Sequence, residues 1–78
     1  MKYKIFTSDS IEVIHNETLI GEADNFQDAC RIIKQQISFA EFNPYWRFIL
    51  GDIATFVDYG SYSEFVAIVP PVPMEEMS

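Results

Sequence analysis

The sequence contains a single cysteine and few basic residues. One Cys among 78 residues excludes an intramolecular disulfide and a zinc site built from several cysteines. Five Lys and Arg against twelve Asp and Glu give a net charge of -7. Because nucleic acids and anionic membranes are bound by neutralising phosphate charge, we expect neither as a direct partner. The acidity either keeps a small apolar protein soluble or matches a basic partner.

Long apolar runs and internal repeats are also missing. No run approaches the roughly 18 residues of a membrane span, and residues 1–9 lack the apolar core of a signal peptide, so we expect a cytoplasmic protein. Three of the four prolines lie at positions 70, 71 and 73, where they stop the last strand. The sequence therefore predicts one domain over residues 1–69 and a Pro-rich, acidic, flexible tail over residues 70–78.

Apolar and aromatic residues are plentiful, at 49% and 15% of the chain. A domain of this size buries only about 60 to 65% of its unfolded surface, so its core is thin. The clearest local pattern covers residues 53–69, where two runs rich in β-branched and aromatic residues flank Gly60. Because Gly60 accepts the positive φ of a tight turn, this stretch predicts a β-hairpin.

Further strands are expected on both sides of a central helix. Alternation and β-branched content predict strands over residues 2–7, 11–15, 18–23 and 45–50, with turns at Asn16-Glu17 and Gly51-Asp52. The second turn would pair Leu50 with Ile53. From residue 26, apolar side chains recur at helical spacing after the cap candidates Asp24 and Asn25. This stripe consists of Phe26, Ala29, Cys30, Ile33, Ile37 and Ala40, and Pro44 ends the segment.

These elements predict an α+β fold, with a small antiparallel sheet of about five or six strands in the order β-β-β-α-β-β-β and one amphipathic helix on one face. The helix would cover Trp46, Phe48, Leu50, Val57, Val66 and Ile68. The opposite face is also apolar. One helix of about 15 residues, roughly 22 Å long, cannot cover both faces.

Catalytic residues are not indicated. His15 has no nearby Cys or second His, and Cys30 lies on the apolar stripe, where a thiol is an inert hydrophobe. Asp52, Asp58 and Glu64 are explained by turn positions. We therefore expect no enzyme, no cofactor and no metal site. Arg47 and Asp58 are expected to form a cross-strand ion pair.

Residues 45–48, Tyr-Trp-Arg-Phe, and residues 58–65, Asp-Tyr-Gly-Ser-Tyr-Ser-Glu-Phe, resemble a pattern in small proteins encoded by phages and prophages of Gram-positive bacteria. The resemblance covers the C-terminal third of the chain. It implies an accessory protein of a mobile element, a class that often binds and disables a host protein. No functional residue carries over from it.

The resulting prediction is a non-enzymatic protein-protein interaction module that binds a host or defence protein. Because exposed apolar patches are seldom left open, we expect a homodimer, or one protein partner, on the uncovered sheet face. Phe56 and Phe65 would be the anchors, and Ile32 and Phe39 could join the rim. The predicted interaction residues are Tyr45, Arg47, Ile49, Phe56, Asp58, Phe65, Ala67 and Val69. Three alternatives stay open: N-terminal strands or the tail cover this face in a monomer, the protein is an acidic mimic of nucleic acid that blocks a basic groove, or it is a small-molecule-binding or catalytic domain.

Overall fold

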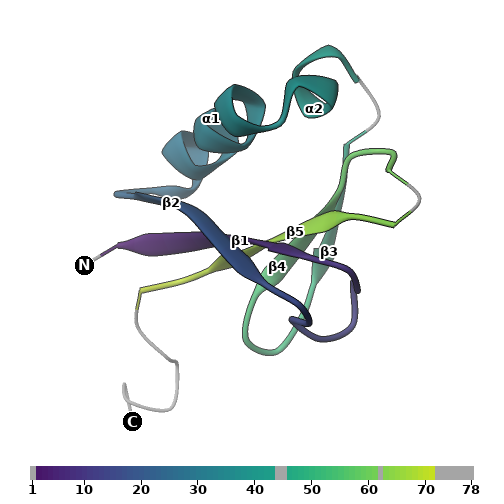
Figure 1. Ribbon diagram of the computed structural model, residues 1–78. Helices are drawn as coiled ribbons and strands as arrows, with labels where there is room; N and C mark the ends of the chain where they lie inside the picture. Colours follow the sequence, from purple (N-terminus) through teal and green to yellow (C-terminus); the bar gives the residue numbers. More distant parts are fainter. Residues whose placement is uncertain (1, 44–45, 62, 72–78) are drawn as a thin grey trace, which may run out of the picture.

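The computed structural model describes residues 2–43, 46–61 and 63–71, except for the side chain of Phe39. Its elements are β1 (Tyr3–Ser8), β2 (Thr18–Ala23), α1 (Phe26–Gln36), α2 (Ser38–Phe42), β3 (Arg47–Leu50), β4 (Thr55–Asp58) and β5 (Phe65–Val69). The five strands form one antiparallel sheet in the order β2-β1-β5-β4-β3. Both helices lie on one side of it (Figure 1). The predicted α+β class is therefore confirmed.

The predicted element order is wrong at the N-terminal end. Residues 11–15 are not a strand but part of the loop that joins β1 to β2, residues 9–17. Asn16 was expected in a two-residue turn; it adopts a positive φ of 52° within this longer loop. A β-branched run such as Ile-Glu-Val-Ile satisfies strand propensity, but here it finds no neighbouring strand with which to pair.

Local side-chain chemistry starts α1. Asn25 is the N-cap, and its side-chain oxygen accepts a hydrogen bond from the backbone nitrogen of Asp28 at 2.8 Å. Asp28 also pairs with Arg31 at 2.9 Å. Its carboxylate lies in the first turn, at the positive end of the helix dipole, where a negative charge stabilises the helix. The buried residues of α1 are Ala29 and Ile33. The predicted start at Phe26 is confirmed.

The helix is shorter than predicted. Ile37 leaves the helical region, with φ -123° and ψ 99°, and separates α1 from α2. Its backbone N–H still donates to the carbonyl of Ile33 at 2.9 Å. The break turns α2 so that Ala40 is fully buried. No Gly or Pro marks residue 37, so local sequence gives no stop signal there.

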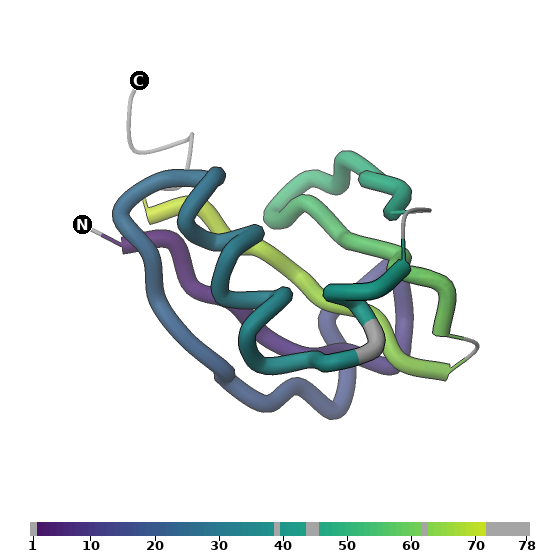
Figure 2. Tube along the Cα trace, turned by 90° about the horizontal axis from the view of Figure 1, so that it is seen from above, coloured from purple at the N-terminus to yellow at the C-terminus, as the bar shows by residue number. Residues whose placement is uncertain are grey.

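α1 packs mainly against β2 and β1, and it reaches the β3 edge through Phe26, whose ring lies against that of Phe48. From above, the β3-β4 hairpin lies beside the helices rather than beneath α1 (Figure 2). We call the helix-covered side of the sheet the helix face. Its buried cluster consists of Ile5, Ala23, Ala29, Ile33, Ala40, Val57, Tyr59, Val66 and Ile68. No described helix is long and apolar enough to cross a membrane.

The β3-β4 register differs from the prediction by two residues. Leu50 pairs with Thr55 rather than with Ile53, and Asp52 and Ile53 form the loop. A shift of two residues leaves every side chain on its predicted face. The contact of the helix with Leu50 is nevertheless wrong, since Leu50 is 86% exposed.

Candidate functional site

The predicted interaction face is covered by the chain itself. We call this side of the sheet the loop face, because the β1-β2 loop packs on it through Ile11 and Ile14. Phe56 is only 2% exposed and Ala67 is fully buried. The prediction that they form an open patch is therefore wrong. An N-terminal segment covers this face, but it is a loop and not the N-terminal strands or the tail that the alternative named.

The other predicted interaction residues lie in mixed surroundings. Ile49 and Val69 pack half-buried beside Phe56 and Ala67, and Phe65 is also half-buried. Tyr45 lies outside the described residues, as does the side chain of Phe39, which was expected at the rim. Ile32 packs against the helix-face cluster. The structure thus places Ile49 and Val69 against the buried Phe56 and Ala67, and Ile32 in the cluster of the opposite face.

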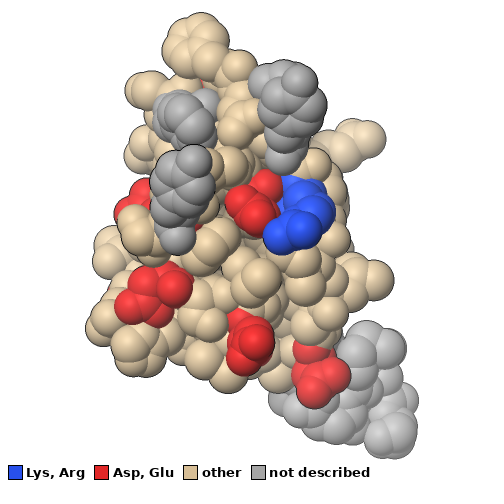
Figure 3. All heavy atoms as spheres, turned by 90° about the vertical axis from the view of Figure 1, so that its right-hand side faces the viewer, with Lys and Arg blue, Asp and Glu red and all other residues tan. Residues whose placement is uncertain are grey.

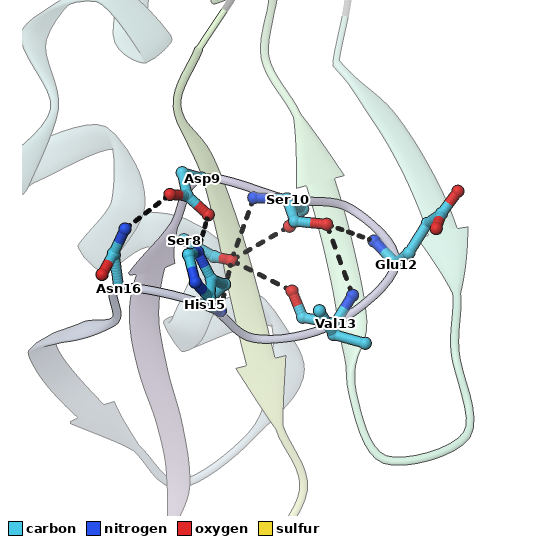
Figure 4. Close-up of polar contacts among 7 residues, drawn as sticks. All are labelled: Ser8, Asp9, Ser10, Glu12, Val13, His15 and Asn16. Atoms are coloured by element: carbon cyan, nitrogen blue, oxygen red, sulfur yellow. Dashed lines mark hydrogen bonds and ion pairs between the residues drawn. The ribbon is translucent and has the colours of Figure 1, made fainter.

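A buried serine holds the covering loop in place. Ser8 is 2% exposed, and its hydroxyl oxygen accepts hydrogen bonds from the backbone nitrogens of Ser10 at 3.2 Å and His15 at 3.1 Å. The same hydroxyl lies within donating distance of the carbonyls of Ser10 and Val13, at 3.0 and 3.3 Å. Figure 4 shows these contacts meeting at Ser8 from both sides of the loop. The Ser8 side chain therefore supplies hydrogen bonds to loop backbone groups that a neighbouring strand would otherwise satisfy.

Asp9 closes the base of the same loop. Its carboxylate oxygens lie 2.7 Å from Nδ1 of His15 and 2.7 Å from the side-chain nitrogen of Asn16 (Figure 4). These hydrogen bonds, that of Asn16 first, lower the pKa of Asp9 below its ordinary value. His15 is exposed, and its ring nitrogen ties the end of the loop to Asp9.

Arg47 and Asp58 form the expected ion pair. They stand directly opposite each other in the β3-β4 register, and Nη2 of Arg47 lies 3.0 Å from a carboxylate oxygen of Asp58. Asp58 also accepts a hydrogen bond from the backbone nitrogen of Gly60 at 3.0 Å, and Gly60 has the positive φ, 100°, that the turn requires. The pair therefore links the edge strand to the β4-β5 turn.

A cavity of about 460 Å³ opens on the helix face, at the end where α2 approaches β3. Its lining combines aromatic rings with a few polar groups: Cys30, Lys34, Glu41, Phe42, Asn43, Trp46 and Phe48. Phe42 is 79% exposed, and Phe48 is about half exposed. No sequence pattern placed Phe42 at a surface site, because the residue falls after the apolar stripe and before Pro44.

Trp46 forms the fixed wall of this cavity. Its indole nitrogen donates to the carbonyl of Ala40 at 2.8 Å, which ties the segment before β3 to α2. Its ring centroid lies 6.2 Å from that of Phe48 and 5.7 Å from Nζ of Lys34. These are tilted aromatic and cation-π arrangements. The aromatic row continues to Phe26, whose ring lies 5.8 Å from Phe48.

The titratable side chains that line the cavity are Cys30, Lys34 and Glu41. Partial burial raises the pKa of the Cys30 thiol, so this thiol is not activated as a nucleophile. Among the described residues, no group of three His, Cys, Asp or Glu side chains is placed to hold a metal ion. The cavity instead offers aromatic walls, one ammonium group from Lys34 and one carboxylate from Glu41.

Comparison of the chain with protein-family models, curated proteins and solved structures gives no match.

Proposed function

We propose that this protein is a non-enzymatic protein-protein interaction module whose partner docks at the helix-face cavity. The observation that carries this proposal is the exposed aromatic row at the cavity, above all Phe42 at 79% exposure. Large exposed rings beside a concave, aromatic-lined surface are typical of the centres of protein interfaces. The docking surface thus differs from the one expected from the sequence.

The partner would offer an apolar or aromatic side chain together with a basic group. Glu41 lines the cavity and belongs to none of the ion pairs found among the described residues. The chain as a whole carries a charge of -7, which attracts a basic partner at long range. The apolar side chain would supply affinity, and the charges would supply orientation.

The biological setting we propose is that of a phage or prophage accessory protein acting on a host or defence protein in the cytoplasm. The resemblance of residues 45–48 and 58–65 to such proteins supports this setting. Residues 46–48, Trp-Arg-Phe, include two cavity-lining aromatics. The resemblance and the site therefore overlap in one segment.

Two other functions have some support. Acidic side chains are scattered over the face drawn in Figure 3, where the basic atoms form one group against an acidic one. This distribution favours an acidic mimic of nucleic acid, whose binding would weaken steeply with salt.

The cavity volume of about 460 Å³ also falls in the range of small-molecule sites, about 300 to 1,000 Å³. Stabilisation by one compound of a metabolite panel would favour that function.

Peptide display tests the proposal. Peptides would be selected on the wild type, with counter-selection on Phe42→Asp, and their affinities measured by fluorescence anisotropy. We expect apolar, basic peptides that bind Phe42→Asp at least about tenfold more weakly. Val13→Asp is the matched control, because Val13 is also exposed but lies on the β1-β2 loop. Equal binding to all three proteins would refute the cavity as the docking site.

A further inference from the structure

The two edge strands of the sheet, β2 and β3, differ in how open they are to pairing with a further strand. At the β2 edge, α1 packs against the strand, and the register with β1 shifts between Ile5 and Phe6. At the β3 edge, only β4 among the described strands pairs with the strand, and the register from Arg47 to Leu50 is regular. β3 ends in three consecutive apolar residues, of which Leu50 is 86% exposed. A regular apolar edge of this kind is open to further strand pairing.

One contact shows which residues of β3 point their backbone N–H and C=O groups toward β4 and which point them away. The backbone nitrogen of Gly51 donates to the carbonyl of Ala54 at 2.9 Å. Because inward and outward groups alternate along an antiparallel strand, Ile49 and Gly51 turn their backbone groups toward β4. Phe48 and Leu50 therefore turn their N–H and C=O groups away from the sheet. These outward groups are spaced for another antiparallel strand.

We propose that a second copy of this chain pairs with β3, antiparallel, about a two-fold axis at Ile49. In this register Phe48 lies opposite Leu50 of the second copy, and the same pair occurs twice. Each such pair exchanges two backbone hydrogen bonds and matches an aromatic with an aliphatic side chain on the helix face. On the loop face, Ile49 of one copy lies opposite Ile49 of the other.

The charges at the ends of β3 are self-complementary. Arg47 begins the strand, and Asp52 follows its end, so antiparallel pairing brings Arg47 of each copy toward Asp52 of the other. Arg47 is 68% exposed, and the ion pair with Asp58 involves one of its nitrogens, which leaves guanidinium donors for a second carboxylate. Asp52 is exposed and belongs to none of the ion pairs of the described residues. This complementarity favours a second copy over an unrelated peptide.

The arrangement has a consequence for binding. An axis perpendicular to the sheet keeps both helix faces on the same side, so the two cavities would open side by side. The dimer would present two equivalent docking sites to a partner and gain avidity without new contacts. This inference goes beyond the proposed function and does not depend on it, since the edge and the cavity can be altered separately.

Sedimentation equilibrium of the wild type and three variants tests the pairing. We expect a monomer-dimer equilibrium in the wild type at concentrations up to about 1 mM. Leu50→Lys adds a charge opposite Phe48 and should weaken the dimer at least about tenfold. Leu50→Pro removes an outward N–H without removing a bond to β4, and it should do the same. Circular dichroism checks that each variant is folded.

Leu19→Lys is the matched control, because Leu19 is an exposed apolar residue of the opposite edge strand, β2. It should leave the dimer unchanged. A wild type that stays monomeric at about 1 mM, a dimer that survives Leu50→Lys, or equal loss in Leu19→Lys would each overturn the proposal. If Leu50→Pro unfolds, Leu50→Lys alone decides. Peptide binding at the cavity is measured separately, so failure of the dimer leaves that result intact.

Discussion

The hydroxyl oxygen of Ser8 lies 3.1 Å from the backbone nitrogen of His15, seven residues further along the chain. This contact joins the end of β1 to the far side of the β1-β2 loop. The loop in turn places Ile11 and Ile14 against Phe56 and Ala67. One buried hydroxyl thus helps to turn an apolar sheet face into a second core.

Ser8→Ala should destabilise the protein by about 1 to 3 kcal/mol, because it leaves the part-buried backbone groups of Ser10, Val13 and His15 without their partner. The measurement is chemical denaturation followed by circular dichroism. Ser63→Ala, at an exposed serine of the β4-β5 turn, should change the free energy of unfolding by less than about 0.5 kcal/mol. Equal effects of the two substitutions would show that the loop does not depend on Ser8.

Phe56→Ala should lower the free energy of unfolding by about 3 to 5 kcal/mol, since it opens a cavity beneath the loop. Leu50→Ala, on the same hairpin but 86% exposed, should cost no more than about 0.5 kcal/mol. Urea denaturation of the two variants provides the comparison. A Phe56→Ala protein as stable as the wild type would mean that the loop face is open in solution.

Gly21 and Ile32 should show coupled effects. A Cβ atom at position 21 would lie 2.8 Å from Cγ2 of Ile32, so Gly21→Ala should cost about 1 to 3 kcal/mol through overpacking. In an Ile32→Ala background the same substitution should cost less, because the opposing atoms are gone. Additive free energies in this double-mutant cycle would contradict the close packing of α1 on β2.

Tyr59 should make stability fall at high pH. Burial, followed by its hydrogen bond of 2.9 Å to Glu64, raises the pKa of Tyr59 well above its ordinary value near 10. The folded state therefore keeps the proton that the unfolded state loses, and the stabilisation is present below pH 10 and declines as the pH rises further. Denaturation of the wild type and Tyr59→Phe at several pH values isolates this contribution. A stability difference between them that does not shrink above pH 10 would contradict the assignment.

Local signals predicted much of the fold. The N-cap at Asn25 and the hairpin around Gly60 depend on short-range features, and the structure confirms both, with strands over Thr55–Asp58 and Phe65–Val69. The register error of two residues at Leu50 left the side-chain faces intact, because side chains in a strand alternate with a period of two. The prediction of the Arg47-Asp58 ion pair is confirmed for the same reason, since both side chains stay on one face of the sheet.

Features that depend on tertiary contacts were not predictable in this way. Residues 11–15 have strand propensity, but the buried hydroxyl of Ser8 holds them as a loop. The break at Ile37 has no helix-stop residue and is stabilised by the packing of Ala40 and Trp46. The candidate site followed the same pattern. Sequence periodicity identified two apolar faces of the sheet. Tertiary contacts then cover one of them with the β1-β2 loop and leave exposed rings on the other, beside α2.

Site-specific photo-crosslinking tests the central claim, that partners dock at the helix-face cavity and not at the loop face. A benzophenone amino acid would replace Phe42 in one protein and Val13 in another, and each would be irradiated in a lysate of a Gram-positive bacterium. We expect a discrete protein adduct from position 42 that excess wild type competes away and excess Phe42→Asp does not. Adducts from position 13 alone, or identical competition by Phe42→Asp, would contradict the account.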